Sequence, residues 1–333
     1  MATWMRLSYP HLIDAVFSDS GPLYAKEDFP EYLEVITEVL ETQGGGACLS
    51  SVSEAITRMQ EMLHTNVGAA QISTMFNTCA PLQANVTLDT STFFWYGITE
   101  TFAQLVQYAV PGDVASACRV ITDSSEPNPV QRLANWINNM TESCIESRYS
   151  EVVMKHRNTS YDSNETTMRL WTYQTCVEYG WYQTTSSPRQ PFLSTVPLQY
   201  FHQMCKDFFS NDVNEELLNS GIHRTNLFFG GMVRPGGVVS VAGGADPWSP
   251  VGPNATHSTT SSPVYFLPDV SHCRAIRPTA SSETEALRDV KLAVLSDMSF
   301  LLTGSPGMAA SAQVAGVTPV AMLAALVAML ISV

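Results

Sequence analysis

An aspartate and a histidine follow two successive predicted strands in the last third of the chain. Residues 238–241 (Val-Val-Ser-Val) are apolar and mostly β-branched, a pattern typical of a buried parallel strand. A Gly-Gly pair then turns the chain before Asp246, and a second strand at residues 263–267 precedes His272. In open α/β sheets, ligands and catalytic side chains collect beyond the carboxyl ends of the strands. The sequence therefore predicts an α/β fold with Asp246 and His272 at one edge of a sheet.

An acid after one strand and a histidine after the next is the chain order of the last two members of a Ser-Asp-His triad in α/β-hydrolases. In that chemistry the imidazole takes the proton of the nucleophile, and the carboxylate orients the imidazole and stabilises its charged form. Spacing alone leaves another interpretation open, in which Asp246 is a turn residue and His272 lies in a surface loop.

Four stretches of the sequence resemble the prolyl carboxypeptidase and dipeptidyl peptidase II family of serine exopeptidases. The resemblance is collinear over residues 1–302. Its motifs are GGADPWSPVG at residues 243–252, DVSHCRAIRP at 269–278, WTYQTCVEYGWYQTT at 171–185 and the segment of residues 5–32. By matched position, the resemblance implies that Asp246 is the triad acid and His272 the base.

The resemblance also implies a domain organisation. Residues 1–40 and 223–302 would belong to the C-terminal part of an α/β-hydrolase fold, residues 41–222 to an inserted helical cap domain, and residues 303–333 to a spacer and tail. Three segments depart from the family pattern, at residues 18–22, 249 and 274–276, and they leave room for a protein that has lost catalysis. The departure at Ser249 also puts a substrate role of that position in doubt.

The nucleophile of the family is absent from the sequence. In the family a G-G-S-Y-G-G turn comes just before the segment that matches residues 5–32, and no G-x-S-x-G frame occurs here. We expect the serine to lie upstream, in a longer protein of which this chain is a part, and this chain alone to be inactive. A gene that encodes only this chain is the alternative. Ser20, in Ser-Asp-Ser-Gly-Pro, is a weaker candidate for a substitute nucleophile.

Charge and cysteine spacing exclude other classes of protein. The formal net charge of -14 argues against nucleic-acid binding, which needs a basic surface. None of the seven cysteines falls in a C-x-x-C pair, so we expect no zinc site, no other metal and no cofactor. Scattered cysteines together with N-x-S/T sequons favour an oxidising, secretory environment. The sequons are at Asn85, Asn139, Asn158, Asn164 and Asn254.

The middle of the chain reads as helices. Residues 28–41 predict a helix with Asp28 as its N-cap, and apolar spacing predicts further helices up to about residue 222. Six cysteines lie in this region, and for them we expect a nested pairing of Cys48 with Cys144, Cys79 with Cys176 and Cys118 with Cys205. Residues 226–233 predict a strand, and residues 282–302 a helix with a capping box at Ser282 and Glu285.

Aromatic residues near the motifs are candidates for a substrate pocket. A proline-specific exopeptidase needs an apolar wall for the proline ring, which Trp181, Tyr182 and Trp248 could supply. Glu178 could pair with the terminal amine of a peptide, as an aminopeptidase requires. The alternative is that the aromatic residues pack a helical cap and that Glu178 is an ordinary solvated carboxylate.

The tail differs in character from the rest of the chain. Residues 303–313 are small and polar, and residues 314–333 are apolar and uncharged. Small residues, a polar spacer and a terminal apolar stretch form a signal for a GPI anchor, and a retained transmembrane helix is the alternative. We therefore expect an extracellular or cell-surface protein held at a membrane by this tail, with a lysosomal location as the alternative.

The predicted function is a serine exopeptidase that acts on peptides as a Pro-Xaa carboxypeptidase or as a dipeptidyl peptidase. The sequence does not separate these two activities, and it leaves open whether the protein is a homodimer. A non-catalytic, surface-anchored binding protein with a hydrolase-like fold is the alternative, because residues 18–22 and 274–276 depart from the family pattern.

Overall fold

A computed structural model describes residues 1–163 and 165–304 of the chain. Most of the polar spacer, the whole apolar tail of residues 314–333 with its predicted anchor signal, and the sequon residue Asn164 therefore lie outside the described residues. Within the described residues, no helix is long and apolar enough to cross a membrane.

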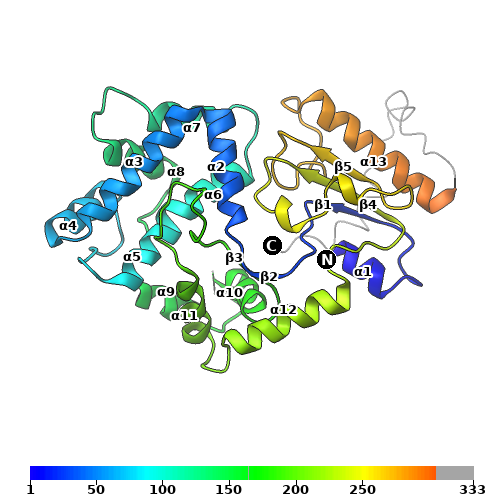
Figure 1. Cartoon of the computed structure of the whole chain (residues 1–333), viewed down its shortest axis with the longest axis horizontal. Coiled ribbons are helices and arrows are strands. Elements are labelled where there is room, and N and C mark those ends of the chain that lie inside the picture. Colours follow the sequence, from blue (N-terminus) through cyan, green and yellow to red (C-terminus); the bar gives the residue numbers. More distant parts are fainter. Residues whose placement is uncertain (164, 305–333) are drawn as a thin grey trace.

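A parallel sheet of three strands carries the predicted Asp and His loops (Figure 1). Its strands are β1 (Val16–Asp19), β4 (Val238–Gly243) and β5 (Val264–Leu267), in the order β1-β4-β5. All six residues of β4 are buried, which confirms the expectation of a buried parallel strand. The first strand begins at Val16, because the residues before it form a turn in which Leu12 donates to the carbonyl of Tyr9.

Helix α13 (Glu285–Thr303) packs along this sheet. Val239, Val241 and Leu267 of the strands form one buried cluster with Leu287 and Val294 of the helix. The short helix α1 (Ala2–Ser8) lies beside β1, and Figure 1 shows these two helices on opposite sides of the strands. Helices on both sides of a parallel sheet are the arrangement of an α/β fold.

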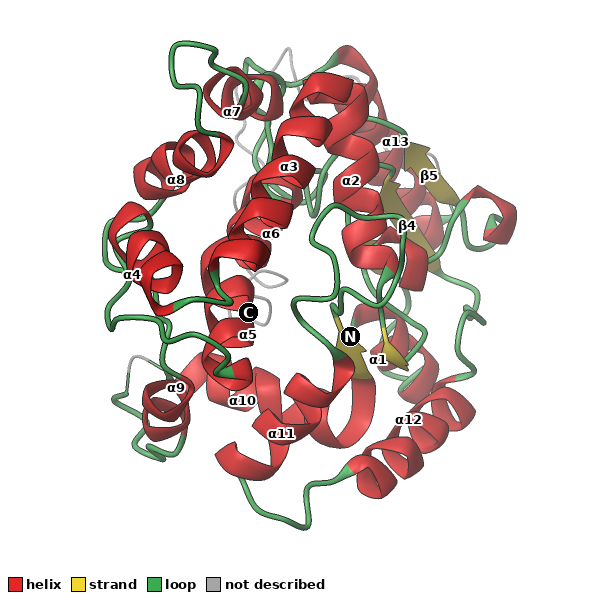
Figure 2. Ribbon diagram, turned by 60° about the vertical axis from the view of Figure 1, so that its left-hand side comes forward, coloured by secondary structure: helices red, strands yellow, loops and turns green. Residues whose placement is uncertain are grey.

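Helices form the other side of the molecule (Figure 2). They enclose most of a second, larger core, to which Trp248 of the Asp246 loop and Trp4 of α1 also belong. Two segments of π-helix, Phe94–Thr99 and Thr175–Tyr179, interrupt them. The helices are α2 (Glu31–Gly44), α3 (Gly46–Met62), α4 (Asn66–Met75), α5 (Thr87–Phe93), α6 (Glu100–Gln107), α7 (Asp113–Ile121), α8 (Pro129–Met140), α9 (Tyr149–His156), α10 (Thr166–Gln174) and α11 (Leu198–Phe208).

A second, two-stranded parallel sheet and one long helix lie between these two regions. The strands are β2 (Lys26–Asp28) and β3 (Gly180–Tyr182). The helix, α12 (Glu215–Phe229), extends into the segment 226–233 for which a strand was predicted, so that prediction is wrong. Asn226 stays helical because its side chain exchanges two hydrogen bonds with the backbone of Ala25, and Gly230 then ends the helix with a left-handed φ of 73°.

Two predicted helix starts are also wrong. Asp28 lies in β2, where its carboxylate accepts hydrogen bonds from Thr184 and Ser186, so α2 begins after Pro30 without it. Helix α13 begins one residue after Thr284, whose hydroxyl accepts the backbone N–H of Leu287. Ser282 is therefore not the cap, because several hydroxyl residues precede the helix and the one next to its first turn is Thr284.

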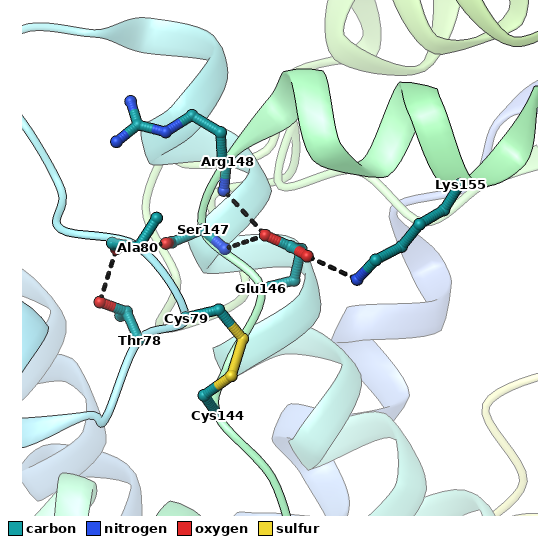
Figure 3. The surroundings of a disulfide bond; sticks show 8 residues. All are labelled: Thr78, Cys79, Ala80, Cys144, Glu146, Ser147, Arg148 and Lys155. Atoms are coloured by element: carbon teal, nitrogen blue, oxygen red, sulfur yellow. Dashed lines mark hydrogen bonds and ion pairs between the residues drawn. A yellow bond between two sulfur atoms is a disulfide. The ribbon is translucent and has the colours of Figure 1, made fainter.

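The first two disulfides interleave along the chain and the third joins two successive cysteines, so the predicted pairing is wrong. The pairs are Cys48–Cys118, Cys79–Cys144 and Cys176–Cys205. Local packing decides them: Cys79 donates its backbone N–H to Ile145, which places Cys144 next to it (Figure 3). All seven cysteines are among the described residues, and Cys273 is left as a free thiol, as expected.

Candidate active site

Asp246 and His272 meet at the carboxyl-terminal edge of the three-stranded sheet. Nδ1 of His272 lies 3.0 Å from each carboxylate oxygen of Asp246. The Asp246 side chain is buried, with 1% of its surface exposed, and it also accepts the backbone N–H of Trp248 at 2.9 Å. The His272 side chain keeps 18% of its surface exposed. The two predicted residues therefore form a carboxylate–imidazole pair that solvent reaches from the imidazole side.

The glycines of the turn after β4 allow this approach. A Cβ atom on Gly243 would lie 2.0 Å from the carbonyl oxygen of Val270, and one on Gly244 would lie 2.4 Å from that of Pro268. Real side chains do not tolerate such distances to backbone atoms. The Gly-Gly pair is thus what lets the loop before His272 pack against the loop that carries Asp246.

The electrostatics of the pair favour a charged imidazole. Burial lowers the pKa of His272, but the hydrogen bond and negative charge of Asp246, with a contribution from the Cys273 thiol, raise that pKa to about 10. A proton held on Nδ1 by a buried carboxylate fixes the orientation of the ring. Nε2 is then the nitrogen that exchanges a proton with a neighbouring group.

The end of β1 fastens the loop that follows His272. The carboxylate of Asp19 accepts the backbone N–H of Ile276 at 2.7 Å, and the hydroxyl of Ser20 accepts that of Cys273 at 3.0 Å. Burial raises the pKa of Asp19 to about 6, and the charge of Asp246 adds to the rise, whereas the hydrogen bond from Ile276 opposes it. Asp19 is thus a second carboxylate near the pair, and the sequence interpretation did not single it out.

Ser20, the weaker nucleophile candidate, is engaged by the loop that follows His272. Its hydroxyl is engaged by the backbone of Cys273, and the hydroxyl of Ser271 donates to the carbonyl of Ala109 at 2.7 Å. Throughout residues 1–163 and 165–304, no serine hydroxyl makes a hydrogen bond with His272.

The last turn of α6 contacts both loops of the pair. The backbone carbonyl of Gln107 accepts the N–H of His272 at 3.0 Å, and its side-chain oxygen accepts the indole N–H of Trp248 at 2.9 Å. Next to it, the ring of Tyr108 stands edge-on to that of His272, with the centroids 6.4 Å apart. Nothing in the sequence pattern indicated these two residues, because they lie far from both motifs along the chain.

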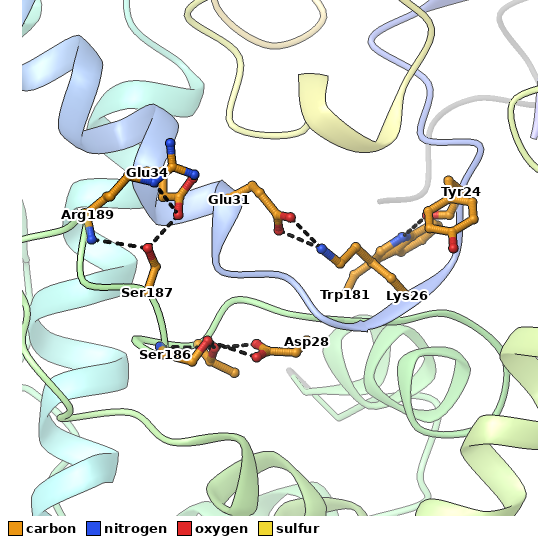
Figure 4. A network of polar contacts seen from close by, with 10 residues as sticks. Tyr24, Lys26, Asp28, Glu31, Glu34, Trp181, Ser186, Ser187 and Arg189 are labelled. Atoms are coloured by element: carbon orange, nitrogen blue, oxygen red, sulfur yellow. Dashed lines mark hydrogen bonds and ion pairs between the residues drawn. The ribbon is translucent and has the colours of Figure 1, made fainter.

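Aromatic rings extend from the pair towards the helices. The Trp248 ring lies 6.4 Å from that of His272, and the rings of Trp181 and Trp171 lie 5.6 and 6.0 Å from Trp248. Trp181 is anchored by an N–H···O bond of 2.9 Å to the backbone of Tyr24 (Figure 4). Two predicted pocket residues, Trp181 and Trp248, are therefore brought together, with Trp171 as a third ring, and it is Trp248 whose ring lies next to that of His272.

The other two pocket candidates lie elsewhere. Tyr182 stacks on Phe201 with ring centroids 5.0 Å apart, and its hydroxyl lies 3.0 Å from the sulfur of Cys205. Glu178 lies under α12, where a Cβ on Gly221 would approach its Cα to 3.1 Å. Among the described residues, neither side chain contacts Asp246 or His272.

Four of the five sequons lie on the surface. The side chains of Asn85, Asn139, Asn158 and Asn254 are exposed, and Asn254 also caps a short 3-10 helix. Exposure is what attachment of a glycan requires.

Comparison with known proteins finds relatives that are named as serine proteases or serine carboxypeptidases. A serine protease homologue of Caenorhabditis elegans is 26% identical over 87% of this chain, which covers 60% of that relative. The mouse thymus-specific serine protease is 28% identical over 86% of this chain and 59% of its own length. An extracellular serine carboxypeptidase homologue of Arthroderma benhamiae is 29% identical over 47% of this chain and 24% of its own. The chain thus spans about three fifths of the first two relatives.

The family assignment follows from a match over most of the chain. The sequence profile of the family described as "Serine carboxypeptidase S28" matches residues 1–294, which include the sheet, the helical region and both members of the pair. Members of this family are serine peptidases, and the resemblance inferred from the four motifs is thereby confirmed. The chain belongs to the Serine carboxypeptidase S28 family.

Proposed function

We propose that the whole protein is a serine exopeptidase in which Asp246 is the triad acid and His272 the general base. The observation that carries this proposal is the hydrogen-bonded pair at the carboxyl-terminal edge of a parallel sheet, in a chain of a serine peptidase family. We further propose that the nucleophilic serine belongs to a part of the protein upstream of this chain, and that residues 1–333 alone do not hydrolyse peptides.

In the proposed mechanism, Nε2 of His272 takes the proton of the serine hydroxyl as that oxygen attacks the peptide carbonyl. The same nitrogen then gives the proton to the leaving amine, and an acyl-enzyme remains. Water hydrolyses the acyl-enzyme by the same proton route. Asp246 stabilises the imidazolium that forms in each half of the reaction.

The proposed mechanism sets the direction of the pH dependence. Only the neutral imidazole can accept the proton of the serine, and Asp246 holds the pKa of His272 high. Activity should therefore rise with pH on the acidic side of the profile, as His272 loses its proton.

Substrate selection is proposed to lie with the aromatic rings beside the pair. Trp248, Trp181 and Trp171 offer an apolar wall within reach of His272, suited to a proline ring or a small apolar side chain next to the scissile bond. We propose that the helical region, residues 41–222, is a cap over this site. Tyr182 remains a candidate for the apolar wall, and Glu178 remains the candidate partner for a peptide amine.

Two matched peptides separate the exopeptidase classes. One carries a blocked N-terminus and a free carboxyl group after a Pro-Xaa bond, and the other carries a free N-terminal dipeptide and a blocked carboxyl end. Each would be incubated with protein expressed from its complete native coding sequence. Release of the C-terminal residue from the first supports a carboxypeptidase, and release of the dipeptide from the second supports a dipeptidyl peptidase. Cleavage of neither peptide by folded protein would favour the alternative, a non-catalytic binding protein.

We propose a secretory location, extracellular or at the cell surface, for the protein. Three disulfides, four exposed sequons and a relative named as extracellular support it. N-glycans at the sequons and a GPI anchor at the tail are further proposals. Release of the protein from cells by a phosphatidylinositol-specific phospholipase C would support the anchor. Retention of the protein on cells from which the enzyme has fully released a control GPI-anchored protein would refute it.

A further inference from the structure

Gln107, the last residue of α6, uses both ends of its side chain and its backbone in hydrogen bonds. Its side-chain oxygen accepts the hydroxyl of Tyr32 at 2.6 Å as well as the indole N–H of Trp248 at 2.9 Å. Its amide nitrogen donates to the hydroxyl of Tyr108 at 2.7 Å. Its carbonyl accepts the backbone N–H of His272 at 3.0 Å.

The orientation of this amide is fixed by its partners. An indole N–H only donates, so the group that faces Trp248 has to be the oxygen of the amide. The NH2 end then points to Tyr108, whose hydroxyl oxygen can accept. Tyr32 is 2% exposed and Trp248 9% exposed, so neither donor would find water in place of Gln107 without a rearrangement.

These bonds reach both members of the Asp246–His272 pair. Trp248 is held through its ring by Gln107 and, through its backbone N–H, donates to Asp246 at 2.9 Å. His272 is held directly through its backbone. One residue of the helical region thus fixes the two loops that leave the three-stranded sheet.

We propose that Gln107 is a positioning residue that sets the geometry of the Asp246–His272 pair from the helical region. Its bonds join the end of α6 to the loops that carry Asp246 and His272, so movement of the end of α6 would be transmitted to the imidazole. The expected effect on turnover rests on the proposed peptidase function. The expected effect on the pair itself does not.

The first test replaces the amide with an apolar side chain of similar length. Gln107→Met keeps the volume and removes the hydrogen bonds of the side chain, and Gln104→Met, at an exposed position of the same helix, is the matched control. NMR titration of the His272 imidazole, in protein from the complete coding sequence, should show a pKa lower by about half a unit or more in Gln107→Met, because displaced loops lengthen the Asp246–His272 hydrogen bond that raises this pKa. Gln104→Met should titrate like the wild type.

A second variant covers the case in which Gln107→Met does not fold. Gln107→Glu retains oxygens that accept from Trp248 and Tyr32, and adds a negative charge near the pair. The pKa of His272 should then rise by about half a unit to one unit. An unchanged titration in Gln107→Glu, or a Gln107→Met that titrates like Gln104→Met, would overturn the proposal.

Activity measurements complete the test and separate it from the proposed function. A displaced pair should lower kcat about ten- to hundred-fold with little change in KM, because misplacement of a catalytic group acts on the chemical step. If the wild type has no peptidase activity but the titrations shift as described, the positioning role stands and the peptidase proposal falls. If the wild type is active and both variants titrate and turn over like it, the positioning role falls alone.

Discussion

The helical region and the three-stranded sheet region are held together in different ways. The helices enclose a large core of their own and carry all three disulfides. The sheet region has a small core shared with α13, no disulfide and one free thiol, Cys273. Yet the sheet region carries Asp246 and His272. The candidate active-site pair and the disulfides therefore lie in separate parts of the molecule.

This difference indicates how the site is kept in place. Among the described residues, β1 pairs only with β4, and a short sheet offers its loops limited support. The loops are instead fastened from outside, by Asp19 and Ser20 at the end of β1 and by Gln107 at the end of α6. The end of α6 in the helical region thus contributes to holding the loops of the proposed catalytic pair.

The largest expected effect comes from breaking the pair in the sheet region. Asp246→Asn preserves the shape of the side chain but removes the charge that orients and stabilises the imidazole. We expect kcat/KM for peptide hydrolysis to fall by about four orders of magnitude, as for other triad acids. The pKa of His272 should fall as well, because Asp246 is what raises it. Steady-state kinetics and NMR titration measure the two effects, and an Asn variant with unchanged kinetics would contradict the assigned role.

Removing a disulfide should destabilise the helical region. The double variant Cys48→Ala, Cys118→Ala opens a loop of 70 residues and should lower the free energy of unfolding by about 2–4 kcal/mol. The matched control is Cys273→Ala in the sheet region, which breaks no disulfide and should cost less than about 1 kcal/mol. Denaturant unfolding compares the two, and equal losses would show that the disulfide does not stabilise the helical region.

The buried carboxylate of Asp19 should make the stability of the protein depend on pH. Its pKa is raised from 3.8 to about 6, so the folded protein holds this proton more tightly than the unfolded chain. The contribution of Asp19 to stability is therefore full below about pH 4 and is lost as the pH rises through about 6.

Asp19→Asn retains an oxygen that can accept the N–H of Ile276 and has no charge to bury. We expect it to raise the free energy of unfolding at pH 7.5 by about 1–3 kcal/mol and to leave stability at pH 4 nearly unchanged. Asp14→Asn, on the exposed turn before β1, is the control and should change neither value. If Asp19→Asn changed the free energy of unfolding equally at both pH values, the effect would come from altered packing and not from the protonation of Asp19.

The smallest effect concerns the helix that covers the sheet. Thr284→Ala removes the side-chain cap of α13 and should cost about 1 kcal/mol. Ser282→Ala, two residues earlier and exposed, should cost nothing measurable. Thermal unfolding of the two variants compares the observed cap, Thr284, with the predicted cap, Ser282. A larger loss of stability in Ser282→Ala than in Thr284→Ala would show that Ser282 is the cap after all.

The strands, the pair and the family could be predicted from the sequence because their signals are local. Strands β4 and β5 are short apolar runs bounded by turns, and the order acid then histidine fixes which loops meet. The secondary-structure prediction was wrong where one local pattern was compatible with both a strand and a helix. Leu227, Phe228 and Phe229 favour a strand by composition, but they continue α12 up to the glycine that ends it.

The rest of the site depends on contacts that no local pattern encodes. Gln107 and Trp248 are 141 positions apart, and Asp19 and Ile276 are 257 apart. Cysteine spacing likewise does not determine pairing, since six cysteines allow 15 pairings. Packing of the helices selected one in which Cys48–Cys118 and Cys79–Cys144 interleave.

The most direct test of the central claim is active-site labelling with a fluorophosphonate probe. The probe would be applied to folded protein from the complete native coding sequence, and the modified residue would be mapped by mass spectrometry. The account predicts labelling of one serine upstream of residue 1 of this chain, which is lost in His272→Ala. Folded protein that takes up no probe, or labelling that persists in His272→Ala, would contradict the assignment of Asp246 and His272 as the acid and base of a serine peptidase.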